Sequence, residues 1–364
     1  MKTIDGLGLV CGCALLLGCS DDEPEDFRRR VLVSWGEHVI LPLQHDFEAR
    51  AVALDESGRA LCEAPSAERL AAAQAAWWDA REPWKQSEIF AFGPYEDAPL
   101  RLGPKIDFWP ARVEDIELVL GGTDPIAAEI LGATQIGLPV VEYLLHQPSA
   151  ADVALVDELA QSPRRCDHLR VTTGDLVVRA GQMRQAWDPE EGAYLLQLTH
   201  PEQGDSMFET LHMALGEVVN RMAHTIENIR VDKLGRPLGT TEDALLPDPD
   251  TAESRFSGRS LQDIRDNLRV IERLYFGDDS PQSLGLDDYA REQGHDFTQT
   301  MADELASSRE ALDLVPEPLT LAVVDAPGRV DELIRRLGAL QRLIQVDILN
   351  ALSLTPTFND NDGD

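Results

Sequence analysis

Lysine is scarce in this chain: of its 32 basic residues only Lys2, Lys85, Lys105 and Lys233 are lysines, so arginine carries nearly all the positive charge. Acidic residues number 65, and the formal net charge is −33 at pH 7. A body this acidic repels nucleic acid and anionic membrane surfaces and attracts cations. The sequence also has no basic patch interleaved with aromatic residues. We therefore exclude a nucleic-acid partner.

The common catalytic signatures are missing too. No Gly-x-Ser-x-Gly segment marks a serine nucleophile, and no His-Glu-x-x-His segment marks a zinc peptidase. The pair Gly121-Gly122 lacks the Lys-Ser/Thr and the preceding strand of a phosphate-binding loop. Glu209 and His212 form one Glu-x-x-His pair on a predicted helix, whereas a di-iron bundle uses two such pairs and two further glutamates.

Strand patterns and Asn-Gly hairpin signals are absent, whereas helical periodicity dominates. Ser66 stands where a helix N-cap is preferred. Long antiparallel helices joined by loops are typical of helical bundles. We predict an all-α fold of two bundles, residues 31–190 and 191–354, followed by a disordered acidic tail over residues 355–364.

The N-terminal residues have the features of an export signal. Residues 7–17 form an apolar run too short to span a bilayer as a stable helix. The run ends in Leu16-Leu17-Gly18-Cys19, which resembles the lipobox of bacterial lipoproteins. We expect a signal peptide over residues 1–18, a lipid on the Cys19 thiol and an acidic tether over residues 19–30. The alternative is an ordinary cleaved secretory signal.

These features predict a lipid-anchored protein of the cell envelope. Ser20 after Cys19 is compatible with sorting to the outer membrane, where the protein would face the periplasm. Cysteine usage agrees with export, because only Cys62 and Cys166 remain beyond the signal and the lipid site. We predict a disulfide between them, linking the segment after the first helix to a later helical region. It would contribute about 3–5 kcal/mol in the chain-entropy model. The alternative is two buried free thiols.

One segment resembles a known signature with a single residue exchanged. The segment Gly137-Leu138-Pro139-Val140-Val141-Glu142 is similar to the Gly-x-His-x-x-Glu motif of imelysin-like proteins. These are bacterial envelope proteins linked to iron and once thought to be peptidases. Pro139 stands where the family has its histidine. The exchange removes a metal ligand and a candidate catalytic base together, and it leaves the motif carboxylate, Glu142.

Further segments resemble the same family in the same order, over roughly residues 33–351. They are Trp84 to Pro94, Asp107 to Pro110, Lys233 to Gly239 and Glu253 to Ser257. The resemblance implies two helical bundles with a site in the cleft between them.

A cleft between two bundles could gather carboxylates from different elements. Carboxylates are hard oxygen donors suited to iron, manganese or calcium. The expected metal ligands are Glu88, Asp107, Glu142 and Glu253. The other expected site residues are Gly137, Pro139, His146, Trp109, Arg255 and Ser257.

Each charged residue of this set also has a structural interpretation. Glu88 could pair with a nearby arginine at a helix end. Asp107 could hydrogen-bond the backbone in a turn. Glu142 could stabilise the helix N-terminus behind Pro139, and Arg255 could pair with any of these carboxylates.

Three functional hypotheses follow. In the first, an exported lipoprotein holds iron, another oxygen-preferring cation or a metal-bearing ligand, as a non-catalytic component of iron acquisition. In the second, the metal site is degenerate and the helical scaffold docks another envelope protein. In the third, His146 replaces the lost ligand of a metallopeptidase. We disfavour the third, because a peptidase needs a held metal and a base, and Glu142 alone cannot supply both. Converging carboxylates would favour the first hypothesis and an exposed apolar patch the second.

Overall fold

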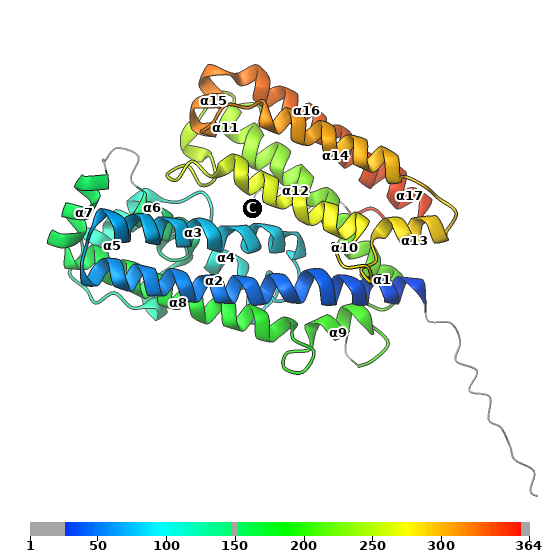
Figure 1. The fold of residues 1–364 in the computed structure, drawn as a ribbon, viewed down its shortest axis with the longest axis horizontal. Coiled ribbons are helices and arrows are strands. Elements are labelled where there is room, and N and C mark those ends of the chain that lie inside the picture. The colour runs from blue at the N-terminus through cyan, green and yellow to red at the C-terminus, as the bar shows by residue number, and fades with distance from the viewer. Residues whose placement is uncertain (1–25, 147–151, 205, 358–364) are drawn as a thin grey trace, which may run out of the picture.

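The computed structural model describes residues 26–146, 152–204 and 206–357 (Figure 1). Within these ranges every regular element is a helix or a helical turn, apart from one isolated bridge between Thr241 and Ala244. The all-α prediction is confirmed. The predicted signal peptide, Cys19 and most of the acidic tail lie outside the described residues. None of the described helices is both long and apolar enough to span a bilayer.

The first part of the chain forms one group of helices, in which α2 packs against α3 and α8. The first helix starts at Phe27, and a π-helical turn at Gly36–Ile40 joins it to α2 as one continuous rod. The elements of this group are α1 (Phe27–Trp35), α2 (Leu41–Glu63), α3 (Ala67–Ser87), α4 (Gly103–Ile106), α5 (Val113–Gly121), α6 (Leu138–Leu145), α7 (Asp152–Gln161), α8 (Pro163–Trp187) and α9 (Tyr194–Thr199).

The second part of the chain forms another group, in which α16 packs against α10 and α14. π-Helical turns at Ile229–Gly235 and Leu343–Ile348 extend α10 and α16. The elements are α10 (Leu211–Asn228), α11 (Arg236–Leu238), α12 (Ser260–Phe276), α13 (Leu286–Glu292), α14 (Thr298–Asp313), α15 (Leu319–Asp325), α16 (Pro327–Arg342) and α17 (Leu349–Ala351).

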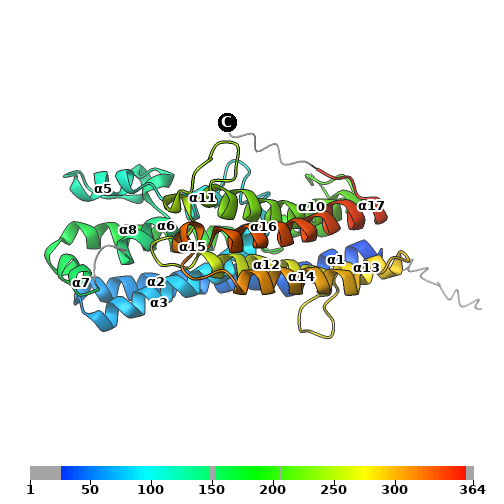
Figure 2. The ribbon, with the colours of Figure 1, turned by 90° about the horizontal axis from the view of Figure 1, so that it is seen from above.

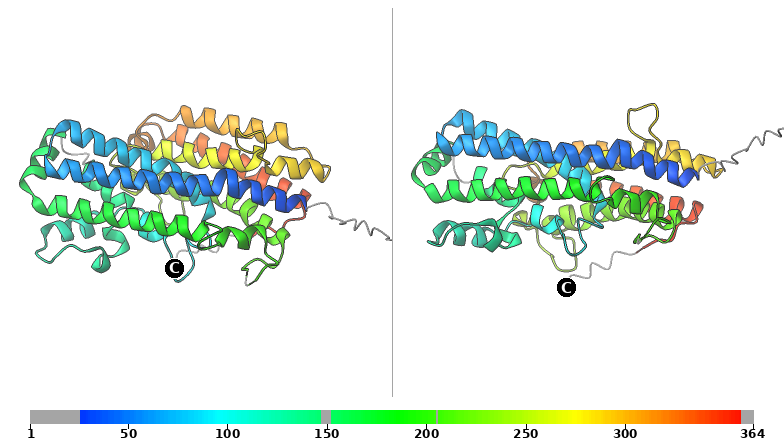
Figure 3. Two further views of the ribbon diagram at one scale, coloured as in Figure 1. Left: turned by 60° about the horizontal axis from the view of Figure 1, so that its bottom comes forward. Right: turned by 90° about the horizontal axis from the view of Figure 1, so that it is seen from below.

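The long helices of both groups run close to the long axis of the molecule (Figures 2 and 3). The contact between the groups includes α12 against α3, α1 against α10 and α13, and α10 against α9 and the 3₁₀ turn at Glu88–Phe90. Buried apolar side chains of both groups form one continuous core cluster. The indole of Trp35 on α1 donates to the carbonyl of Leu274 on α12 at 3.0 Å. The division into separate domains near residue 190 therefore stays a prediction.

Several predicted boundaries differ from the structure. The tether is shorter than expected, because Asp26 caps α1 by accepting from the amide of Arg28 at 2.9 Å. The tail begins later than expected. The Asn220 side chain donates to the carbonyl of Thr355 at 3.0 Å and accepts from the amide of Thr357 at 2.9 Å. These two bonds hold the start of the predicted tail against α10.

The predicted disulfide between Cys62 and Cys166 is confirmed, with Cα atoms 5.5 Å apart. Cys62 belongs to the last turn of α2, not to the loop after it. Cys166 lies in the first turn of α8. The bond therefore fixes two neighbouring long helices at one end of their contact.

Candidate functional site

The site begins with two cations on the buried face of α3. Arg81 and Lys85 are four residues apart, so one helix face presents both toward α12. Their exposed fractions are 1% and 0%. Cations this deeply buried require partners, because desolvation of an unpaired charge is very costly.

Three carboxylates supply partners for the ammonium of Lys85. Its Nζ lies 3.2 Å from Asp107 Oδ2 and 2.5 Å from Glu253 Oε1, and it also contacts Glu88 Oε1. Glu88 follows α3 in a 3₁₀ turn, Asp107 ends α4, and Glu253 lies in the loop before α12. Segments of both helix groups therefore meet at one lysine.

A second lysine, Lys233, binds the remaining oxygens of two of these carboxylates. It lies in the π-helical turn after α10. Lys233 Nζ lies 3.1 Å from Glu88 Oε2 and 3.1 Å from Glu253 Oε2. It also donates to Asn267 Oδ1 on α12 at 2.9 Å.

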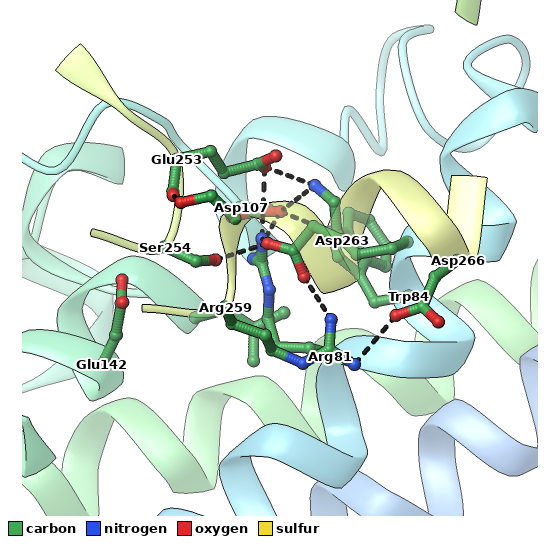
Figure 4. Close-up of polar contacts among 12 residues, drawn as sticks. Arg81, Trp84, Asp107, Glu142, Glu253, Ser254, Arg259, Asp263 and Asp266 are labelled. Carbon is green, nitrogen blue, oxygen red and sulfur yellow. Dashed lines mark hydrogen bonds and ion pairs between the residues drawn. The ribbon is translucent and has the colours of Figure 1, made fainter. Parts of the chain in front are cut away.

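Arg81 extends the network toward α12. Its guanidinium binds Asp107 Oδ2 at 2.8 Å, Glu253 Oε1 at 3.1 Å and Asp263 Oδ2 at 2.9 Å (Figure 4). The indole of Trp84 donates to the same Asp107 oxygen at 2.7 Å. Asp107 is therefore a charge-paired residue rather than a turn residue bonded to the backbone.

The network continues to Arg259 at the start of α12. Its guanidinium pairs with Asp263 and lies 2.8 Å from Asp266 Oδ2. Ser254 has a φ of 47°, in the left-handed region, and its hydroxyl donates to Asp263 Oδ2 at 2.5 Å. This bond and the adjacent ion pairs hold the backbone of the loop in a strained conformation.

The pKa shifts show how strongly the partners act. Burial alone would lower the pKa of Lys85, but Glu253, Glu88 and Asp107 outweigh it and hold that pKa well above its usual value. Burial alone would raise the pKa of Glu253, but Lys233, Lys85 and Arg81 lower it. Both groups of the Lys85–Glu253 pair are therefore charged at neutral pH.

Glu142 lies apart from this network (Figure 4). Its Oε1 accepts from the amides of Phe256 and Ser257 at 3.0 and 2.8 Å, and from the Ser257 hydroxyl at 2.8 Å. Burial raises its pKa to about 7, although the bonds from Ser257 oppose the shift. The motif carboxylate thus holds the 254–257 loop of the second helix group against α6 of the first. It does not join the predicted metal ligands.

The motif's other residues set the position of α6. Gly137 has a φ of 90°, and a Cβ there would lie 2.5 Å from the carbonyl oxygen of Ile106, so only glycine fits. Pro139 falls in the first turn of α6, where its missing amide proton costs no helical hydrogen bond.

The remaining predicted residues take structural positions. His146 ends α6 and packs edge-on against Trp77, and burial lowers its pKa to about 4. Its backbone amide binds the carbonyl of Glu142, but the histidine belongs to no group of converging metal-ligand side chains in the described part of the chain. Arg255 pairs with Asp250.

The charge network opens to a cleft of about 420 Å³ between the two helix groups. Glu88, Asp107, Glu253 and Lys233 line its inner end, and Trp109 lines its wall. A second, very small cavity separates Glu142 from Asp107 and Glu253. The structure therefore places Glu142 and Trp109 near the network, with Glu142 outside its ion pairs.

Glu88, Asp107 and Glu253 could in principle hold a metal ion, because one oxygen from each lies within 4.8 Å of the others. The donor chemistry fits iron or manganese. The position does not, because the Lys85 ammonium contacts all three carboxylates. A metal ion at this position would be repelled by the Lys85 ammonium, which the three carboxylates hold in place, so these residues do not fit a bound metal.

Sequence reasoning did not find Arg81, Arg259 or Asp263 as site residues, and it included Lys85 and Lys233 only as members of family-like segments. One signal was available: lysine is rare in the chain, yet two of its four lysines meet here. A scarce residue type can indicate a specific role, but the sequence separation of positions 85 and 233 gave no reason to expect them at one site.

The fold and site define a class: an all-α protein with two helix groups joined by a buried network of paired charges. The model of the imelysin family (peptidase M75) matches residues 40–344, and the chain belongs to that family. It is 27% identical to iron-regulated protein A of Synechococcus elongatus, over 90% of this chain and 87% of that protein.

Two solved structures share the fold. A putative iron-regulated protein A precursor from Parabacteroides distasonis superposes with a TM-score of 0.74 at 20% identity, covering 92% of this chain and 97% of that one. An imelysin-like protein from Psychrobacter arcticum gives a TM-score of 0.69 at 18% identity, covering 91% and 97%.

Proposed function

We propose that this protein is a non-catalytic component of an iron-related process at the bacterial cell envelope, and that it docks a partner protein through a groove along α10. The groove has a volume of about 670 Å³. Its floor includes Phe92 and Phe208, whose rings lie edge to face at 6.2 Å. Met207 and Met213 also line it, with exposed fractions of 48% and 47%. This apolar groove is the observation that carries the proposal.

The groove rim favours a positively charged segment. Three carboxylates, of Glu96, Asp97 and Glu217, line it against one arginine, Arg221, which pairs with Glu96 and Glu217, so the lining keeps an excess of negative charge. Methionine side chains adapt to varied apolar partners. We therefore assign the groove to an extended segment of another envelope protein that carries apolar and basic side chains.

The chain itself supports an extended ligand on this face. Thr355 and Thr357 line the same groove. Asn220 binds the backbone of both in the donor-and-acceptor manner in which an amide recognises an extended peptide. A partner segment would run alongside this stretch and fill the apolar space beside it.

The non-catalytic part of the proposal rests on the motif. Pro139 supplies no ligand and no base. The Oε1 oxygen of Glu142 already accepts three hydrogen bonds from the 256–257 segment. His146 packs against Trp77, and within the described part of the chain it belongs to no group of converging metal-ligand side chains. These observations weigh against a water-activating site.

The iron and envelope parts rest on the relatives and the N-terminus. The name of the Synechococcus relative refers to regulation by iron. The Leu16-Leu17-Gly18-Cys19 lipobox supports a lipid anchor. We do not extend the proposal to iron held by Glu88, Asp107 and Glu253, because Lys85 already takes that position.

A peptide titration tests the docking groove. The mature soluble chain from Ser20 is titrated against a fluorescent octapeptide of alternating leucine and lysine, with fluorescence anisotropy as the readout at physiological ionic strength. We expect saturable binding. Met213→Lys should weaken it by about tenfold or more, because the variant loses apolar surface that the peptide would cover and places an ammonium beside the lysines of the peptide.

The matched control is Val178→Lys on α8, where an exposed valine (54%) lies outside the residues that line the groove. It adds the same charge, so it separates loss of the groove from general electrostatic attraction to an acidic body. Equal effects of the two substitutions, or equal binding of a leucine–glutamate octapeptide, would overturn the docking proposal.

A further inference from the structure

Two lysine ammonium groups in the buried network are bridged by two carboxylates. Glu88 contacts Lys85 through Oε1 and Lys233 through Oε2. Glu253 does the same, at 2.5 Å to Lys85 through Oε1 and 3.1 Å to Lys233 through Oε2. Each glutamate therefore uses one oxygen for each cation.

A terminal oxygen donor completes each end of this arrangement. Asp107 Oδ2 lies 3.2 Å from Lys85 Nζ, and Asn267 Oδ1 lies 2.9 Å from Lys233 Nζ. This arrangement has two cations bridged by two carboxylates, with further oxygen donors at the ends. It is the coordination pattern of two-metal carboxylate sites. Here both cation positions are held by side chains of the chain itself.

The residue type fits this role. An ammonium is a compact point charge with three donors, which matches the three oxygens around each lysine, whereas a guanidinium is a planar fork that cannot lie between converging oxygens in the same way. The chain uses arginine almost everywhere else, with only four lysines among 32 basic residues. Two of those four occupy these two positions, and both are buried.

The charges also balance around the lysines. The buried network contains five carboxylates and four cations, so its net charge is close to zero with both lysines in place. The carboxylates are Glu88, Asp107, Glu253, Asp263 and Asp266, and the cations are Arg81, Lys85, Lys233 and Arg259. Removing one lysine leaves an excess of two negative charges in a desolvated region, which one divalent cation would neutralise.

We propose that Lys85 and Lys233 are the resident cations of a carboxylate-bridged two-cation site. They hold the junction of the two helix groups together without a metal. A divalent, oxygen-preferring cation enters only when an ammonium is removed. This inference is independent of the docking groove, because the two use different residues.

The test compares wild type with Lys85→Ala, using the mature chain from Ser20 and Mn²⁺ as the probe. Binding is followed by calorimetry and by loss of the electron paramagnetic resonance signal of free Mn²⁺. We expect Lys85→Ala to bind one more Mn²⁺ per chain than wild type. The affinity of this additional site should be about tenfold or more above that of any Mn²⁺ site in wild type. Its melting temperature should be below that of wild type in chelator and should rise with Mn²⁺.

Two further variants make the result specific. Lys105→Ala is the matched control, because Lys105 Nζ donates to the carbonyl of Leu100 at 2.7 Å and forms no ion pair with a carboxylate of the described residues. It should gain no Mn²⁺ site. Adding Glu253→Gln to Lys85→Ala should remove the new site, since it replaces the bridging carboxylate.

Three outcomes would overturn the proposal. One is a wild-type chain that binds Mn²⁺ as tightly as Lys85→Ala. Another is binding by the variant that survives Glu253→Gln. The third is a Lys85→Ala chain that fails to fold both with and without Mn²⁺. A Lys85→Ala chain that fails to fold in chelator but folds when Mn²⁺ is added would instead support the proposal. Lys233→Ala provides a second, independent variant with the same expected gain.

Discussion

Glu142→Gln should make the protein more stable at alkaline pH, and the effect should vanish in acid. Glu142 is 2% exposed, and burial raises its pKa to about 7 from an ordinary value of 4.5. Between these two pH values the folded carboxyl keeps a proton that the unfolded chain has lost. Folding stability therefore falls as pH rises through this window, because the folded state binds more protons than the unfolded state.

The size of the effect follows from the pKa difference. Each pH unit within the window costs about 1.4 kcal/mol, so the loss accumulates to about 3 kcal/mol by pH 8. Glutamine resembles the protonated carboxyl and does not titrate. Its carbonyl oxygen can still accept from the amides of Phe256 and Ser257 and from the Ser257 hydroxyl. Wild type and variant should match at pH 5, and the variant should be more stable by up to about 3 kcal/mol at pH 8.

Urea unfolding at pH 5, 6, 7 and 8 measures this difference. The relevant quantity is the gap between variant and wild type at each pH, because other groups titrate in both proteins alike. Glu209→Gln removes one exposed carboxylate and serves as the control for a change in net charge. A gap that does not widen with pH, or a variant less stable than wild type at pH 8, would refute the argument that burial dominates at Glu142.

Three further predictions concern the rest of the chain. Reducing the Cys62–Cys166 bond, which spans 104 residues, should cost about 4–5 kcal/mol of unfolding free energy in the chain-entropy model, and melting with and without reductant measures the loss. Arg81→Met should cost about 3–5 kcal/mol in urea unfolding because it removes one of the few cations that neutralise the buried carboxylates Asp107, Glu253 and Asp263, whereas Arg269→Met at an exposed ion pair should cost about 1 kcal/mol or less; equal losses would contradict the role given to the network. Cys19→Ala should abolish incorporation of labelled palmitate and release the protein from membranes, and retained label would point to a different anchor.

The predicted site shows where sequence reasoning reached its limit. The sequence placed Glu88, Asp107 and Glu253 in one cleft by resemblance, and the structure brings these three together. Glu142 was assigned to the same set, yet it bonds the 256–257 backbone instead. Both roles require a buried carboxylate, so residue type could not distinguish them.

The sequence by itself determined the helices and the covalent link. Ser66 marks the N-cap of α3, where its hydroxyl accepts from the amide of Arg69 at 3.3 Å. Once the predicted signal peptide and lipid site are set aside, Cys62 and Cys166 leave one possible intramolecular pairing, and that pair forms. These features depend on periodicity, caps and residue counts, which are local properties of the chain.

Only the tertiary structure decided what the carboxylates bind. Lys85 and Glu253 are separated by 168 residues along the chain, and their contact arises because α3 packs against α12. Whether a carboxylate faces a metal, an ammonium or a backbone amide depends on which elements meet it in space. Helical periodicity fixes the face on which a side chain lies, but it carries no information about the partner that the opposite helix brings.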